Sequence, residues 1–557
     1  MITGNNFGEN IFDATNIGEN YPGVTLPLTF SFVRSAYTHV YTGFLRLLLT
    51  SNKKIIENSY AVSNLVAYVD GRIFYNLTNW YRLLKSLPFY QSNKKFFNRM
   101  LSPVKSLDTI DAEPSRVSFL SGFMYIFYIL FPWFRTAVFE RDFKNLFVEF
   151  DPLVWKKYPT VQLINKFEQL RDSFFGLWAN TIVNDFHVMV FWGLLVSVAK
   201  KTFNKPELFL NSVVSARMFP ASLKPLEELK KITLSVRDSP GLVRLFDLPA
   251  PEIWKLVMTD SQYRSLKTDL LTYLDRYGDR SGQELKLEVP KFSEKPEQVI
   301  SLLQGYLQTR DHNTGDKKQF PQPMFVKQPI LLPLVSLLKY IAVRGIYRRE
   351  KYRLMRGRAY GIARAVFLEL GDRLKVGHHI ASSDDVFYLE YSELASLVLF
   401  QSIPINPRDL ISRRKKLIDS YKHKKVTTRT LAYNWNLDSS QLVHDEGILP
   451  KKLTGTGTSI TPPVTGRVVV MEEFSVSIPV NGAILVTKKT DPGWTVLFPM
   501  IKGIITETGS TLSHASIIAR ELGVPCITGV KNCTTILKTG DIVTVIPGTG
   551  EVVVKNI

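Results

Sequence analysis

The stretch TETGSTLSHASIIARELGVP at residues 506–525 determines how the C-terminal part of the chain is organised. An apolar run at residues 503–505 has the composition of a buried strand, and a turn of small residues follows it. Apolar residues then recur from 515 to 522 at the spacing of one helix face. Gly523 and Pro525 are residues that end helices. The pattern predicts a strand, a turn and a short helix.

His514 stands at the start of that predicted helix. The first backbone N–H groups of a helix have no helical partners, so this position favours an anion such as a phosphate. Imidazole is also a side chain that forms covalent intermediates. A nucleophile beside a phosphate-binding helix start indicates a phosphohistidine.

Composition sets the broad class of the protein. The chain has 557 residues, 45% of them hydrophobic, which predicts two to four domains with large cores. Its two cysteines, Cys526 and Cys533, exclude a disulfide framework and a multi-cysteine metal site. Such cysteine usage suits a reducing cytoplasm. The first ten residues carry no signal-peptide pattern, and we expect a cytoplasmic protein.

The formal net charge is +20. It indicates either a basic surface without a special role or an affinity for nucleotide phosphates, an acidic protein or anionic lipid. The most basic run, residues 413–429, comes without a zinc pattern, an aromatic stripe or a helix-turn-helix signature. We therefore expect no nucleic-acid partner.

Residues 117–134 contain no charge and approach the length of a membrane span. They are crowded with aromatics, broken by Pro132 and flanked closely by Arg116 and Arg135. This favours a buried helix that lines an apolar cleft, with membrane association as the less favoured alternative.

The remaining patterns predict a multidomain α + α/β protein. Residues 1–440 are mostly helical, with a small β-hairpin near residues 60–76 where Asp-Gly marks the turn. Residues 441–463 are rich in Gly, Ser, Thr and Pro and indicate a linker. Residues 464–557 contain short β-rich runs around the His514 helix, which predicts a compact α/β domain.

A basic long helix is predicted around residues 332–374. Within it, Arg349 and Arg353 are four residues apart, and Glu350 precedes Arg353 by three, so the three share one face. The pattern fits a solvated face with internal ion pairs. It equally fits an arginine cluster that receives a phosphoryl group.

The C-terminal hundred residues resemble a known family. Thr506, Gly509 and the run LSHASIIARELGVP at residues 512–525 are similar to the mobile phosphohistidine domain of phosphoenolpyruvate synthase, pyruvate phosphate dikinase and rifampicin-type phosphotransferases. The run TDPGWT at residues 490–495 resembles the rifampicin branch most closely. Ser510 departs from the Gly-Gly pair of the family, and serine is costlier than glycine wherever φ is positive.

Weaker similarity to the helical substrate domain of that branch is found at residues 16–29, 71–77, 349–350 and 383–394. The resemblance implies a substrate-binding domain followed by a swivelling β/β/α phosphohistidine domain. The ATP-grasp domain usual in the family is not recognised in this sequence. We therefore expect a separate ATP-grasp protein to bind ATP and Mg²⁺ and to phosphorylate the histidine.

The resemblance also implies roles for individual residues. His514 would carry the phosphoryl group to a hydroxyl of a small, apolar acceptor held by the helical domain. Arg349 and Arg353 would stabilise the group in transfer. The phosphate loop would comprise Gly509, Ser510, Thr511, Leu512 and Ser513, and the domain motif Asp491, Trp494, Arg520 and Glu521. No metal ligands are predicted. The alternative is a non-catalytic ligand-binding or scaffold protein that retains the fold.

Overall fold

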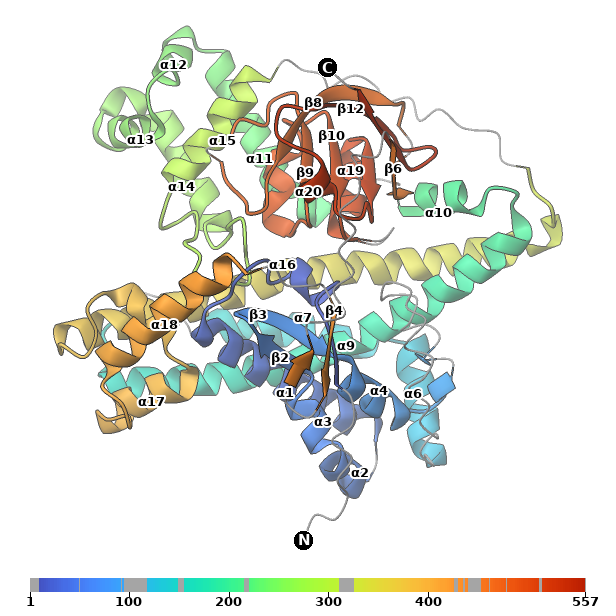
Figure 1. The fold of residues 1–557 in the computed structure, drawn as a ribbon, viewed down its shortest axis with the longest axis horizontal. Helices are drawn as coiled ribbons and strands as arrows, with labels where there is room; N and C mark the ends of the chain where they lie inside the picture. The colour runs from blue at the N-terminus through green and yellow to red at the C-terminus, as the bar shows by residue number, and fades with distance from the viewer. Residues whose placement is uncertain are drawn as a thin grey trace. The chain divides into compact units, whose positions relative to one another are not determined.

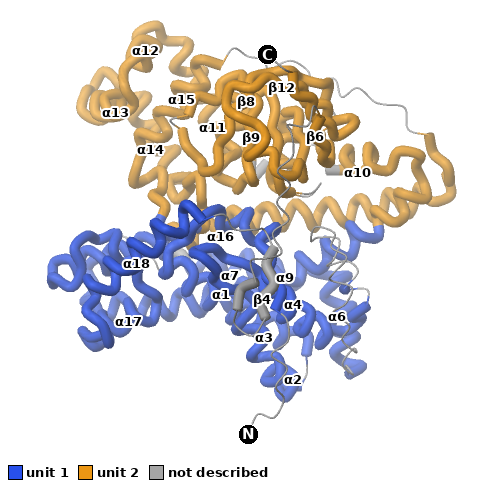
Figure 2. The backbone as a smooth tube through the Cα atoms, viewed as in Figure 1, with its two compact units in different colours: residues 1–194, 286–288, 362–444 blue, residues 195–285, 289–361, 445–557 orange. Residues whose placement is uncertain are grey.

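The structure is a computed structural model, and its description covers most of the chain. The described residues are 10–49, 51–91, 93–94, 118–148, 155–214, 220–309, 325–424, 429–433, 436–438, 452–459, 461–476, 478–509 and 513–555. They form two compact units (Figure 2). Unit 1 contains residues 1–194, 286–288 and 362–444, and unit 2 contains residues 195–285, 289–361 and 445–557.

Unit 1 is mainly helical (Figure 1). Its helices are α1 (Pro27–Leu48), α2 (Asn52–Glu57), α3 (Ser59–Ser63), α4 (Leu77–Lys85), α6 (Phe119–Leu130), α7 (Trp133–Val148), α17 (Tyr391–Phe400) and α18 (Pro407–Lys422), with most of α9 (Thr160–Thr202) and the last part of α16 (Leu332–Val376). Helix α1 begins at Pro27, where a missing N–H costs nothing. Its N-terminus is held by Glu288, whose carboxylate accepts hydrogen bonds from Leu26 N and Thr29 Oγ.

A five-stranded sheet completes unit 1, with the strand order β2-β3-β1-β4-β5. The strands are β1 (Asn10–Asp13), β2 (Val66–Val69), β3 (Arg72–Asn76), β4 (Arg429–Tyr433) and β5 (Asn436–Asp438). Strands β2 and β3 form the predicted hairpin. Its turn residues Asp70 and Gly71 both have positive φ, 46° and 71°, as a tight hairpin turn requires.

Helix α6 corrects the expectation of a buried helix at residues 117–134. Ser118 caps it by accepting a hydrogen bond from Ser121 N, and the chain turns before Pro132. Only one side is buried, through Tyr125, Tyr128 and Ile129, while the opposite side is exposed. The sequence pattern could not show this, because an uncharged run contains apolar residues on every face of the helix.

Several described helices reach the length of a membrane span. By length and composition alone, α9 and the helix at Pro329–Val376 could cross a bilayer. Helices α6 and α7, which meet at a bend of 69°, would count as a third span if taken as one.

The helices of unit 2 lie before its sheet in the sequence. They are α10 (Pro206–Val214), α11 (Pro220–Arg237), α12 (Pro240–Leu245), α13 (Ala250–Thr259), α14 (Arg264–Tyr277) and α15 (Glu297–Gln308), together with the end of α9 and α16 as far as residue 361. In Figure 1, α11 to α15 form a group beside the sheet of the same unit.

An eight-stranded mixed sheet forms the rest of unit 2, in the order β6-β13-β12-β8-β9-β10-β11-β7. The strands are β6 (Lys452–Thr454), β7 (Thr456–Gly457), β8 (Val464–Val470), β9 (Ile484–Thr487), β10 (Gly503–Thr506), β11 (Cys526–Thr528), β12 (Ile542–Ile546) and β13 (Glu551–Lys555). Strands β8 to β11 are parallel neighbours. Helix α19 (His514–Leu522) is the crossover from β10 to β11, and α20 (Cys533–Ile536) precedes β12.

Strands β6 and β7 lie inside the predicted linker at residues 441–463. They pair with β13 and β11 at the two edges of the sheet. Gly455 and Gly457, which indicated a linker, allow close backbone approach instead: a side chain at Gly457 would come within 1.7 Å of Pro547 O. The sheet of unit 2 therefore includes strands that precede residue 464. The domain boundaries at residues 440 and 464 remain a prediction.

Strands β9, β10 and β11 of this sheet are buried on both faces. Successive residues alternate between two cores: Ile505 and Ile527 pack in one, and their neighbours Ile504 and Cys526 pack in the other. A strand covered on both faces is expected to read as a continuous apolar run, as β9 does.

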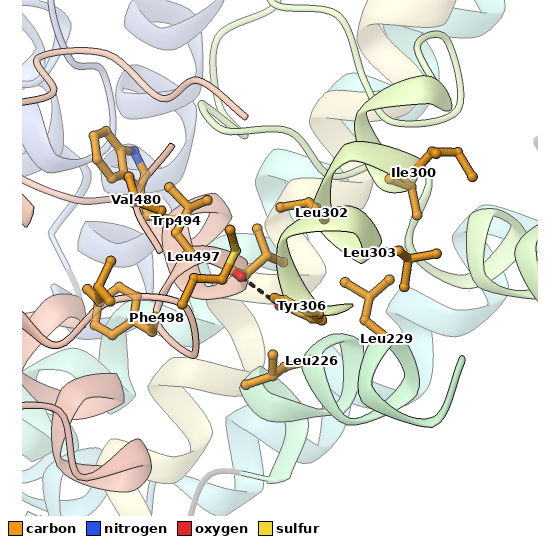
Figure 3. Packing of buried hydrophobic residues seen from close by; sticks show 14 of the residues in the cluster. Leu226, Leu229, Ile300, Leu302, Leu303, Tyr306, Val480, Trp494, Leu497 and Phe498 are labelled. Carbon is orange, nitrogen blue, oxygen red and sulfur yellow. Dashed lines mark hydrogen bonds between the residues drawn. The ribbon is translucent and has the colours of Figure 1, made fainter. Parts of the chain in front are cut away.

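The second of these cores also includes the helices α11 and α15. Leu226 and Leu229 of α11 and Leu302, Leu303 and Tyr306 of α15 pack in one cluster with Val480, Trp494, Leu497 and Phe498 (Figure 3). The Tyr306 hydroxyl donates a hydrogen bond of 2.6 Å to Val496 O. The short helix η7 (Pro492–Leu497) also abuts residues 281–282, since a side chain at Gly493 would come within 1.9 Å of Ser281 O. The helices and the sheet of unit 2 thus share a hydrophobic core.

Candidate functional site

His514 is the first residue of α19, as the sequence predicts. Ser513 precedes it in an extended conformation, and Gly523 ends the helix with φ of 60°. The side chain of His514 is 2% exposed. The nucleophile candidate is therefore buried in unit 2 at the start of a helix.

Glu350 of α16 is the first polar partner of His514. The two side chains approach with 3.4 Å between His514 Nδ1 and Glu350 Oε2, and both are buried. An ionised carboxylate only accepts hydrogen bonds, so Nδ1 carries the proton in this contact. The other ring nitrogen, Nε2, then keeps the lone pair that a nucleophile needs.

Thr495 of η7 is the second partner. Its hydroxyl lies 3.0 Å from His514 Nε2 and 2.7 Å from Pro492 O. The hydroxyl has one proton, so it donates to one of these two acceptors at a time. The sequence motif around residues 490–495 was noted, but nothing in it pointed to Thr495 as the partner of the histidine.

Burial lowers the pKa of His514, although the hydrogen bond and charge of Glu350 act in the opposite direction. For Glu350, burial acts to raise the pKa, but Arg353, His514 and Arg349 together hold it well below its usual value. Because the imidazole is mainly neutral at neutral pH, the charges of the arginines keep Glu350 ionised under those conditions. The site therefore combines a neutral imidazole with an ionised carboxylate.

Arg349 and Arg353 both form ion pairs with Glu350. Their nitrogens lie 3.8 and 3.7 Å from Glu350 Oε1. Their side chains are only 16% and 19% exposed, so they are not part of a freely solvated face. Two cationic side chains therefore converge on the carboxylate that contacts His514.

The predicted phosphate loop is described only at its ends. Gly509 has φ of 137°, and a side chain there would approach Ser513 Oγ to 3.1 Å. Ser513 Oγ lies 2.9 Å from Ser516 Oγ. Ser510, Thr511 and Leu512 lie outside the described residues.

The predicted motif residues all belong to unit 2. Trp494 packs in the core, and Arg520 donates a hydrogen bond of 3.0 Å to Asn211 Oδ1. Asp491 is buried and accepts a hydrogen bond from Gly493 N at 2.8 Å. Burial and the charge of Glu284 raise the pKa of Asp491 well above its usual value. Glu521 is half-buried beside Arg520 on α19.

Two further features bear on ligand binding elsewhere in the described residues. Among the residues that the structure describes, no group of three or more His, Cys, Asp and Glu side chains is arranged to hold a metal ion. Unit 1 contains an open groove of about 520 Å³ lined by residues of α7 and α9, among them Asp142, Asn145, Ser173 and Leu177. Its mixed polar and apolar lining does not identify a ligand.

Comparisons with known proteins agree with this geometry. Residues 478–550, which include η7 and α19, match the family described as PEP-utilising enzyme, mobile domain. Residues 184–322, which include α10 to α15, match the fourth domain of rifampicin phosphotransferase. The mobile domain and the matched helices share the core of unit 2.

Similar full-length proteins come from several bacteria. An uncharacterized protein of Mycobacterium tuberculosis is 27% identical over 331 residues, 59% of this chain and 36% of the relative. Rifampicin phosphotransferase of Bacillus cereus is 25% identical over 288 residues, 48% of this chain and 32% of the relative. The prodigiosin synthesizing transferase PigC of Serratia marcescens is 24% identical over 345 residues, 58% of this chain and 37% of the relative.

The matched part of the chain thus spans about a third of the length of these curated relatives. Together with the mobile domain, the relatives support the general class of phosphotransferase and the predicted resemblance to the rifampicin phosphotransferase branch.

Proposed function

We propose that this chain is the acceptor-binding and carrier component of a phosphotransferase, with His514 as the phosphoryl carrier. The observation that supports this most strongly is the placement of His514 at the start of α19 beside Glu350, within a mobile domain. The acceptor is a hydroxyl of a small apolar molecule bound by the helical part. The protein acts in the cytoplasm.

In the proposed reaction, the unprotonated ring nitrogen attacks the phosphorus of a donor. A phosphorus–nitrogen bond forms as the bond from phosphorus to the donor oxygen breaks. The acceptor hydroxyl then attacks phosphorus, the phosphorus–nitrogen bond breaks with its electron pair returning to the ring nitrogen, and the hydroxyl proton passes to that nitrogen or to water. In the second transfer, with His514 beside α16, Glu350 holds the proton on Nδ1, and Arg349 and Arg353 offset the charge of the phosphoryl oxygens.

ATP and Mg²⁺ take part in the first transfer and are bound by a separate ATP-grasp protein. The described residues of this chain offer no group of three or more side chains that could hold the metal. The burial of His514 supports a carrier that leaves its present environment to react, since a phosphoryl donor cannot reach a side chain that is 2% exposed.

Phosphorylation of the histidine tests the proposal. The chain is incubated with ATP labelled on each phosphate in turn, alone and with an ATP-grasp protein encoded nearby. We expect an acid-labile label only with the partner, lost in His514→Ala and kept in His423→Ala, a histidine at the end of α18.

The outcomes separate the parts of the proposal. Label without any partner would contradict the separate ATP-grasp protein but support the carrier. No label in either condition would leave the alternative, a non-catalytic binding or scaffold protein that retains the fold.

A further inference from the structure

The exposed side of α6 and the turn into α7 form the most prominent apolar surface of unit 1 among its described residues. The side chains of this aromatic elbow are Phe119, Leu120, Phe123, Ile126, Leu130, Phe131, Trp133 and Phe134, all substantially exposed. Phe119 is 92% exposed and Phe134 56%. Contiguous apolar surface of this kind marks a site of interaction.

The spacing of these residues shows a one-sided helix. Phe119, Phe123, Ile126 and Leu130 follow one another at intervals of four, three and four residues, which places them on one face. The opposite face is fixed to the rest of unit 1. The Tyr125 hydroxyl donates a hydrogen bond of 2.6 Å to Asn93 Oδ1, and His187 Nδ1 lies 2.5 Å from Ile129 O.

We propose that the aromatic elbow binds the surface of an anionic lipid bilayer and lies within its interface. Aromatic side chains, tryptophan in particular, favour the boundary between hydrocarbon and headgroups. A helix with one apolar face and its other face held by protein can insert to a shallow depth in that boundary.

Charge and length favour this occupant. The chain carries a net charge of +20. A basic protein is attracted to anionic headgroups.

Helix length and charge argue against a straight span through the bilayer. Helix α6 has 12 residues, about 18 Å of length, against a hydrocarbon core of about 30 Å. Helix α7 carries Arg135, Glu140, Arg141, Asp142 and Lys144, and the two helices are bent by 69°. The elbow therefore rests on a membrane, and this inference is independent of the proposed phosphotransfer.

Vesicle sedimentation of the full chain tests it. We expect the chain to sediment with vesicles of phosphatidylcholine and phosphatidylserine, less with phosphatidylcholine alone, and less at high salt. Phe119→Ser/Phe123→Ser is expected to lower the partition coefficient roughly tenfold or more, since each phenylalanine contributes buried apolar area. Phe134→Ser, on α7, is a second variant that lowers it in the same direction.

Matched controls come from exposed apolar residues elsewhere in unit 1. Val376→Ser/Phe400→Ser removes side chains that are 80% and 74% exposed and is expected to leave the partition unchanged. Circular dichroism confirms that each variant is folded. Equal loss in the control, or no binding to either vesicle, would overturn the proposal. So would retention after alkaline carbonate washing, which indicates a spanning segment, or a Phe119-dependent dimer without vesicle binding, which indicates a second copy as the occupant.

Discussion

At the scale of single residues, the contact between Glu350 and His514 determines the chemistry that the site can perform. The contact joins residues 164 positions apart in the sequence. Sequence spacing predicted that Glu350 lies close to Arg349 and Arg353, because all three are on one helix. It could not predict that Glu350 contacts His514, because this contact depends on how α16 packs within unit 2.

Replacement of Glu350 tests its effect on the histidine. In Glu350→Gln we expect the pKa of His514 to fall further, because the carboxylate is the group that raises it against the effect of burial. An NMR titration of labelled imidazoles measures this, with the His514 signal identified by its absence in His514→Asn.

Glu369→Gln is the matched control, since Glu369 lies on the same helix and pairs with Arg373 instead. It is expected to leave the His514 titration unchanged. An unaltered titration in Glu350→Gln would show that the carboxylate does not act on the imidazole.

The lowered pKa of His514 also makes stability depend on pH. The unfolded chain binds a proton near pH 6.5, whereas the folded chain binds it only at lower pH. Protonation therefore favours the unfolded chain, and stability is lost as pH falls below about 6.5, by about 1.4 kcal/mol for each unit that separates the two pKa values.

Urea unfolding of the wild type and of His514→Asn between neutral and mildly acidic pH measures this loss. The denaturation midpoint of the variant is expected to fall less steeply. Protonation of Glu350, whose pKa is also lowered, reduces stability as well, but only below about pH 4.5. The pH ranges of the two effects can therefore be separated. Parallel curves above pH 5 would contradict the assignment to His514.

At the scale of elements, the turn before α19 places the histidine. Gly509 has φ of 137°, a region that side chains other than glycine rarely adopt, and its surroundings leave little room. We expect Gly509→Ala to destabilise unit 2 by about 1 to 3 kcal/mol, as thermal or urea unfolding would measure.

Gly548→Ala is the control for this substitution. Gly548 has nothing within 4 Å of the added methyl group, so its replacement is expected to have little effect. Equal effects at both positions would show that the conformation of Gly509 is not required.

Elements were predicted well wherever local pattern determines them. The hairpin at Asp70-Gly71, the helix at His514–Leu522 and strand β10 agree with the sequence within a residue or two. Each is bounded by a glycine, a proline or a change of periodicity. The exposed face of α6 and the strands inside the predicted linker could not be found in this way, because burial and edge pairing depend on distant neighbours.

At the scale of the whole molecule, the chain does not fold as consecutive segments. Helices α9 and α16 contribute residues to both units, and residues 286–288 belong to unit 1 although their neighbours belong to unit 2. The composition of the sequence changes near residue 440. It gave no indication that each unit is assembled from segments distant in the sequence.

The shared core of unit 2 predicts that its helices and its sheet unfold together. Leu303 of α15 is fully buried in the cluster with Trp494 and Phe498. Leu303→Ala is expected to cost about 2 to 5 kcal/mol and to reduce the hydrogen-exchange protection of β10 as well as that of α15.

Leu334→Ala, at an exposed position on α16, is the control. It is expected to change neither the free energy of unfolding nor the hydrogen-exchange protection of α15 and β10. Lowered protection confined to α15 would show that the helices and the sheet are separate cooperative units.

The close approach at Gly493 has a consequence for the history of this sequence. A methyl group there would lie 1.9 Å from the carbonyl oxygen of Ser281, so any other residue would push η7 away from the loop. Descendants of a common ancestor that keep this junction are therefore expected to retain glycine at the position, even where identity elsewhere has fallen to a quarter. Replacement of this glycine in a homologue would indicate that the contact between η7 and residues 281–282 has been lost in that lineage.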